Sequence, residues 1–249
     1  MHIAFDIGTG PPVLLHPSLG RSVHDFDGLA NALDHAGFRV VGLEPGGVEP
    51  SDPARFSCSL ADFAMEVIEC AGSIELDRFV VLGHAFGNRI MRNVASYFPD
   101  RVNAIVLLGA GGKFHGDPEA RAAVGATFDA TLSGTDRLAA ISTAFFAPGN
   151  DPAVWIDGWY PAARDVQQAA LIAAEQSDWW LAEPSPMLIV QGLQDRAAPP
   201  ANGQALLEER MGPTTLVELD NCGHAMLPEQ PELIASAVGS FLMSLSLES

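Results

Sequence analysis

The chain has 249 residues, of which 48% are hydrophobic and 18% are charged. This length and composition predict one large globular domain with a sizeable core, and they leave room for an inserted subdomain. With 31 acidic and 13 basic residues the net charge is −18, so the surface repels phosphate backbones and anionic lipids. We therefore expect a small-molecule substrate, and neither nucleic acid nor a membrane, as the partner.

The cysteine content favours a reducing compartment. Cys58, Cys70 and Cys222 are odd in number and lack the spacing of metal ligands, so we expect reduced and mostly buried thiols. The first residues show no basic-then-apolar signal pattern, and no stretch reaches about 18 apolar residues. These features predict a cytoplasmic protein.

Strands and helices are expected to alternate along the first half of the chain. Helical spacing is found over residues 25–36, 60–71 (with Ser59 as the N-cap) and 88–98. Short apolar runs predict strands at residues 2–7, 13–15, 39–43, 78–82 and 102–108. Because most of these runs are continuously apolar, they are typical of a parallel sheet covered by helices on both faces. The pattern predicts a doubly wound α/β fold, with a Pro/Gly-rich loop at residues 44–53.

The second half contains an insertion. Residues 113–184 are rich in alanine, helical in pattern and without a strand run, and the sheet resumes at residues 186–191. Such a segment is too long for a crossover connection, so we expect a helical cap over the strand ends. The core then comprises residues 1–112 and 185–249. Its last elements are predicted as a helix, a strand and a helix at residues 202–211, 214–219 and 229–245.

All four tryptophans of the chain lie in this predicted cap. Most of the cap aromatics should form its own small core, and a minority should face the cleft and make it apolar. The candidates for substrate contact are Leu19, Trp155, Trp159 and Trp180.

The segment Gly83-His84-Ala85-Phe86-Gly87 joins a predicted strand to a predicted helix. Two glycines at this spacing allow a sharp turn and close packing of the helix on the strand, which is the frame of a nucleophile elbow. The middle residue of such a turn points into a cleft, where a serine normally attacks. Here that residue is Ala85, which has no nucleophilic atom.

Two further polar residues follow strands at the same edge of the sheet. Asp195 comes just after one predicted strand, and His224 comes just after the next. Functional groups collect beyond the carboxyl ends of strands in doubly wound sheets. Positions 85, 195 and 224 therefore follow the chain order nucleophile, acid, base.

With these motifs the sequence resembles the α/β-hydrolase superfamily over essentially its whole length. The matching segments are His16-Pro17-Ser18-Leu19-Gly20, Gly83 to Gly87, Gly192-Leu193-Gln194-Asp195-Arg196, and Gly223-His224 with Leu227-Pro228-Glu229-Gln230-Pro231. The resemblance implies an α/β-hydrolase fold, with a mostly parallel sheet of about eight strands and an inserted helical cap. It also implies that Asp195 is the acid and His224 the base of a catalytic triad.

The resemblance further implies an oxyanion hole made of two backbone N–H groups, those of Phe86 and Ser18. Pro17 lacks an N–H group, so it cannot be the second hydrogen-bond donor of the oxyanion hole in its loop. His16 and His84 are interpreted as structural residues. Arg89 and Arg92 are interpreted as surface or ion-pair residues.

Three functions remain open. The first is a hydrolase of a small, mostly apolar ester, lactone or carbon–carbon bond, in which Ala85 replaces the serine of the active form. A chain of this kind is either an inactive variant or an inactive relative, and it should be inactive in serine-type hydrolysis.

The second function is cofactor-free proton transfer by His224 and Asp195, as in a lyase, an isomerase or an oxygenase. The third is non-catalytic binding of a small ligand. No metal or organic cofactor is expected. A dinucleotide-binding motif is not indicated, because Gly8-Thr9-Gly10 lacks the third glycine and precedes a proline pair and not a helix.

Overall fold

The computed structural model describes residues 1–48 and 59–247. Its central sheet has the strand order β1-β3-β2-β4-β5-β6-β7. Strand β1 is antiparallel to β3, and all the other neighbouring strands are parallel. The strands are β1 His2–Ile7, β2 Pro12–His16, β3 Arg39–Glu44, β4 Phe79–His84, β5 Val102–Leu108, β6 Met187–Gly192 and β7 Thr214–Leu219.

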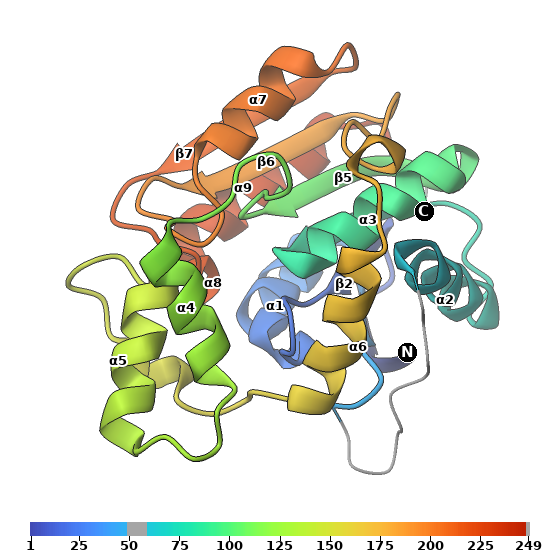
Figure 1. Cartoon of the computed structure of the whole chain (residues 1–249). Coiled ribbons are helices and arrows are strands. Elements are labelled where there is room, and N and C mark those ends of the chain that lie inside the picture. Colours follow the sequence, from blue (N-terminus) through green and yellow to red (C-terminus); the bar gives the residue numbers. More distant parts are fainter. Residues whose placement is uncertain (49–58, 248–249) are drawn as a thin grey trace.

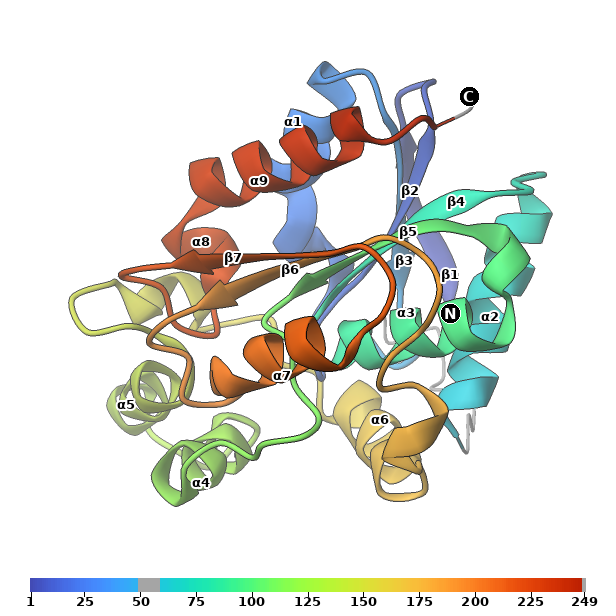
Figure 2. The same cartoon turned by 90° about the horizontal axis from the view of Figure 1, so that it is seen from above.

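Helices cover both faces of this sheet (Figures 1 and 2). Helices α1 (Asp27–His35) and α9 (Pro231–Ser244) lie on one face, and α2 (Leu60–Ser73), α3 (Phe86–Tyr97) and α7 (Ala201–Glu209) lie on the other. Every residue of β2, β4 and β6 is buried, as the continuously apolar strand sequences predict. The doubly wound α/β fold is confirmed.

Two hydrophobic clusters form the core, one on each face of the sheet. On the first face Leu29 and Leu33 of α1 pack with Ile234 and Val238 of α9 over β2 and β4. On the second face the apolar side chains of α2, α3 and α7 pack together. Ser59 caps α2, because its side chain accepts a hydrogen bond of 3.2 Å from the backbone N–H of Asp62.

The segment between β5 and β6 forms helices and, within the described residues, no strand. Its helices are α4 (Pro118–Thr127), α5 (Gly134–Phe145) and α6 (Pro161–Ile172), with short 3₁₀ turns between and after them. Helices α4 and α5 lie side by side near the carboxyl ends of β6 and β7, and α6 lies apart from them (Figure 1). In α6 the Gln167 side chain accepts a hydrogen bond of 2.7 Å from Gly20 N–H, which ties the segment to the loop after β2.

The structure corrects several details of the predictions. The described residues form seven strands, one fewer than the resemblance implies. The helix predicted at residues 229–245 is α9, which begins at Pro231, and a short helix that the sequence pattern does not predict, α8 (Met226–Glu229), precedes it. Cys58 and part of the predicted loop at residues 44–53 lie outside the described residues. None of the described helices is long and apolar enough to cross a membrane.

Candidate active site

The turn between β4 and α3 has the geometry of a nucleophile elbow. Ala85 alone separates the two elements, and its φ of 51° and ψ of −103° are rarely adopted by a residue with a side chain. A methyl group on Gly83 would lie 2.5 Å from Asn88 N, and one on Gly87 would lie 2.7 Å from the Pro17 carbonyl oxygen. Both glycines are therefore required by close backbone approach, as the sequence pattern predicts.

The structure brings His224 and Asp195 together. The Nδ1 atom of His224 lies 2.8 Å from Oδ2 of Asp195, and both side chains are buried. The other carboxylate oxygen accepts hydrogen bonds of 2.9 and 2.7 Å from the backbone N–H groups of Ala197 and Ala198. When Asp195 accepts the hydrogen bond, His224 carries its proton on Nδ1, which leaves Nε2 free to accept a proton from a ligand.

The loop that carries His224 is held from two sides. The His84 Nε2 atom lies 2.8 Å from the carbonyl oxygen of His224, so it donates a hydrogen bond to it. On the other side, the Glu229 carboxylate accepts a 2.7 Å hydrogen bond from Gly223 N–H. The ring of Phe145 stacks on the imidazole of His224 at a centroid separation of 5.8 Å. His84 is thus a bracing residue, as the sequence analysis interprets it.

Burial keeps His84 and the second bracing histidine, His16, uncharged. Burial lowers the pKa of His84 to about 3 and the pKa of His16 to about 4. In His16, Nδ1 lies 3.0 Å from the carbonyl oxygen of Pro17. Both imidazoles are therefore neutral hydrogen-bonding groups at neutral pH.

A cavity of about 240 Å³ lies beside Ala85 and His224. Of the residues proposed from the sequence, Ser18, Leu19, Phe86, Trp155 and Trp159 line it. The remaining lining residues are Arg89, Gly109, Gly111, Arg121, Val124, Phe128, Phe145, Leu171, Ala197 and Ala198. The cavity thus joins the elbow, the base and the predicted cap in one space.

The prediction that Trp180 contacts the substrate is corrected, because Trp180 is not among the residues that line this cavity. Its ring is buried in the core cluster beside Trp179, and its Nε1 donates a 2.8 Å hydrogen bond to Glu209 of α7. An indole with its N–H group already bonded at the helix interface serves packing. Trp180 is therefore a core residue.

The structure also corrects the interpretation of Arg89 and Arg92 in α3 as surface or ion-pair residues. Arg92 is fully buried and donates hydrogen bonds to the carbonyl oxygens of Asn88, Trp180 and Gly111. Arg89 lines the cavity. Neither forms an ion pair with a described residue. The sequence gives only a helical position for them, and the side to which that position turns depends on the tertiary packing.

The oxyanion donors proposed from the sequence lie next to Ala85. Phe86 is the first residue of α3, so its N–H group has no partner within the helix. Ser18 is buried and lines the same cavity, whereas the nearby Gly20 N–H is already bonded to Gln167. The pair Phe86 and Ser18 remains the prediction for the oxyanion hole.

Among the described residues, Cys222 does not supply the nucleophilic atom that Ala85 lacks. The Cys222 side chain is fully buried, and burial raises the pKa of its thiol, which keeps it protonated and unreactive. In the described part of the chain no three His, Cys, Asp or Glu side chains are placed to hold a metal ion.

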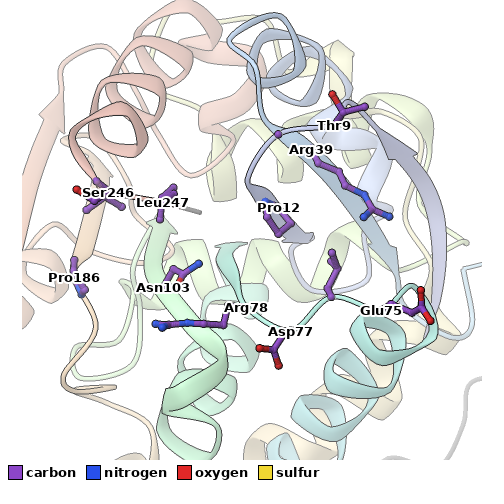
Figure 3. Close-up of a pocket in the computed structure, with 13 residues that line it drawn as sticks. Thr9, Pro12, Arg39, Glu75, Asp77, Arg78, Asn103, Pro186, Ser246 and Leu247 are labelled. Carbon is purple, nitrogen blue, oxygen red and sulfur yellow. The ribbon is translucent and has the colours of Figure 1, made fainter. Parts of the chain in front are cut away.

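A second hollow, of about 650 Å³, lies at the opposite edge of the sheet. It is lined by residues at the amino ends of strands, among them Pro12, Arg39, Asn103 and Pro186, and by the segment after α9 (Figure 3). The elbow and the His224–Asp195 pair are at the carboxyl ends, where functional groups gather in this class of sheet. We therefore place the candidate active site in the smaller cavity.

Comparison with known proteins identifies the family of the chain. Residues 11–140, about half of the chain, match the model of the family described as alpha/beta hydrolase fold. The chain belongs to this family.

Similar proteins include one of Agrobacterium fabrum named "Putative carbamate hydrolase RutD", which is 25% identical over 94% of this chain and 93% of its own length. Two solved structures share the fold across nearly the whole chain. One is named "Putative non-heme bromoperoxidase BpoC" of Mycobacterium tuberculosis (TM-score 0.82, 20% identity, 98% of this chain and 96% of that one). The other is the enol-lactonase of Burkholderia xenovorans (TM-score 0.78, 20% identity, 96% and 95%).

Other curated relatives match over a shorter stretch. An uncharacterized protein of Mycobacterium tuberculosis is 28% identical over 105 residues, which are 42% of this chain and 30% of that protein. The match covers less than a third of that relative.

Proposed function

We propose that the cavity beside Ala85 is the active site of a hydrolase of small carbonyl compounds, such as esters or lactones. The observation that carries the proposal is the buried His224–Asp195 pair, joined at 2.8 Å and placed beside an elbow of the required geometry. In such a site the substrate carbonyl oxygen would be held by the N–H groups of Phe86 and Ser18. His224 would transfer the proton, and Asp195 would stabilise the imidazolium.

Position 85 decides which chemistry this site can perform. A serine there would attack the carbonyl carbon and form an acyl-enzyme while His224 Nε2 takes its proton. Alanine supplies no nucleophilic oxygen. We expect this chain to bind the substrate of the serine form without forming a covalent intermediate.

The test is a paired assay of this chain and its Ala85→Ser variant with 4-nitrophenyl butyrate. A fluorophosphonate label, read by intact mass, reports whether the serine is activated. We expect the serine form to gain one label and to hydrolyse the ester up to about 10⁶-fold faster, the cost of losing the nucleophile in a triad enzyme.

The double variant Ala85→Ser/His224→Ala is the matched control, since it keeps the new serine but lacks the base. It should neither label nor turn over. A serine form that stays unlabelled and inactive although it folds would show that the site is not that of a hydrolase.

A second candidate function is proton transfer to and from a substrate carbon by His224 and Asp195 alone. It is favoured by one observation: the pair and the cavity are complete in a chain that has alanine at the elbow. Deuterium exchange at the α-carbon of phenylacetone, followed by NMR, tests it. This function predicts exchange that is lost in His224→Ala and unchanged in Ala85→Ser, and the absence of exchange would exclude it for this probe.

A further inference from the structure

Arg89 occupies an unusual place in this protein. It is one helical turn after Ala85, in the first turn of α3, and it lines the same cavity as Ala85 and His224. Cations are disfavoured at the amino end of a helix, where the backbone dipoles already create a positive potential. The position therefore costs stability and calls for a compensating partner.

No such partner is found within residues 1–48 and 59–247. The guanidinium of Arg89 makes neither an ion pair nor a hydrogen bond there, and its ring contact is with Trp179, at 5.6 Å from the centroid. Burial lowers the pKa of Arg89 only to about 10, so the group is charged at neutral pH. In contrast, the guanidinium of the neighbouring Arg92 donates to three carbonyl oxygens, and that of Arg21 is paired with Asp25.

The surroundings of the cavity add to this positive charge. Its described lining contains Arg121 of α4 as well as Arg89, and neither Asp nor Glu. Arg121 is exposed and is likewise without an ion pair to any described residue. The chain as a whole is acidic, with 31 acidic and 13 basic residues. Around this small cavity the sign of the charge is opposite, because two arginines without an ion pair to a described residue line it.

We infer that the substrate of this site carries a carboxylate, which Arg89 binds inside the cavity while Arg121 attracts it from the cap side. The inference deepens the proposed function and rests on it, since it takes this cavity as the substrate site. It also changes the expected substrate, from a mostly apolar compound to one with an apolar body and one anionic end.

A carboxylate fits the site better than a phosphate. A guanidinium pairs with a carboxylate through two parallel N–H···O bonds, which use up both acceptor oxygens. A phosphate has further oxygens that need donors, whereas the cavity of about 240 Å³ is otherwise lined mainly by aromatic and aliphatic side chains.

Binding of two matched probes to this chain tests the inference. Phenylacetate and phenylacetamide have the same apolar body and differ in charge, and Trp155 and Trp159 in the cavity wall provide a fluorescence signal. We expect phenylacetate to bind about tenfold or more tightly than the amide, as for a hydrogen-bonded ion pair, and to lose affinity with added salt.

Three variants assign the effect to Arg89. In Arg89→Gln the preference for phenylacetate should disappear, and in Arg89→Lys it should return in part, because the charge is kept without the bidentate geometry. Arg78→Gln is the matched control, since Arg78 is an exposed arginine in the hollow at the opposite edge of the sheet (Figure 3). It should bind both probes as the unchanged chain does. A thermal melt shows whether each variant is folded.

Several outcomes would overturn the inference. They are equal affinities of the two probes, no binding of phenylacetate at millimolar concentration, or a preference that survives in Arg89→Gln. Phenyl phosphate that binds more tightly than phenylacetate would overturn the choice of carboxylate. The ester 4-nitrophenyl butyrate carries no carboxylate, so its hydrolysis by Ala85→Ser tests the proposed function separately from the binding of the two probes.

Discussion

Ala85 has the backbone conformation expected at the centre of a nucleophile elbow, but its side chain has no nucleophilic atom. Its φ of 51° and ψ of −103° place the Cβ atom in a crowded arrangement, and strain of this kind costs about 1–3 kcal/mol. Neighbouring groups impose the conformation, since Ala85 N–H donates a 3.0 Å hydrogen bond to Leu108 O and Asn88 N–H donates one to Ala85 O. The turn is therefore built by its surroundings and does not depend on which side chain it presents.

The strain at this residue leads to a stability prediction. Ala85→Gly removes the crowded Cβ, and its relief should exceed the roughly 0.5–1 kcal/mol of extra chain entropy that glycine loses on folding. We expect the free energy of unfolding to rise by about 1 kcal/mol, measured by urea unfolding. A decrease would show that the turn is not strained.

The Asp195 carboxylate should matter for orientation and charge. In the Ala85→Ser background, Asp195→Asn keeps the shape but favours the wrong tautomer of His224, so turnover of 4-nitrophenyl butyrate should fall by about 10⁴-fold. A loss of only a few fold would mean that other contacts, such as the one from His84, orient the imidazole. Steady-state kinetics of the two variants measures the difference.

At the scale of elements, the unit formed by β4, Ala85 and α3 is stable only if α3 packs closely against the loop after β2. Gly87 lies against the carbonyl oxygens of Pro17 and His16, so Gly87→Ala must push α3 away from the sheet. We expect a loss of several kcal/mol of stability, as for overpacking at a close backbone contact, measured by urea unfolding.

The matched control is Gly239→Ala in the middle of α9. A methyl group there meets nothing within 4 Å, so this change should stabilise the protein by about 0.5–1 kcal/mol. If Gly87→Ala costs no more stability than Gly239→Ala, the packing account of Gly87 is wrong.

The local sequence pattern predicts where helices and strands lie, but it predicts poorly which neighbours their side chains contact. Continuous apolar runs locate the parallel strands, and the glycine spacing locates the elbow. The direction in which Arg89 points, and the burial of Trp180 at the α7 interface, depend on how distant segments pack. Periodicity within one helix or one tryptophan-rich segment does not contain that information.

At the scale of the whole molecule, the buried His16 and His84 predict an acid-sensitive fold. Their pKa values are lowered to about 4 and about 3, whereas histidine in the unfolded chain titrates near 6.5. Between these values the unfolded chain binds more protons than the folded one, so the free energy of unfolding falls as the pH falls. The slope should reach about 1.4 kcal/mol per pH unit for each histidine.

Urea unfolding at several values between about pH 7 and pH 5 measures this slope. His84→Gln keeps a hydrogen-bond donor but cannot titrate, so it should reduce the slope by about half whatever its effect on the stability itself. An unchanged slope in this variant would contradict the assignment.

The Glu229 carboxylate joins the loop that carries His224 to the end of helix α5. It accepts hydrogen bonds from Gly223 N–H, beside the base, and from Ala147 N–H, at the end of α5. The backbone N–H of Ala225 also donates to Phe145 O at 2.8 Å. A movement of α5 away from the sheet would therefore break the hydrogen bonds that hold the loop of His224. We expect ligands to reach the cavity through side-chain rearrangement at its rim, because a movement of α5 would also displace His224.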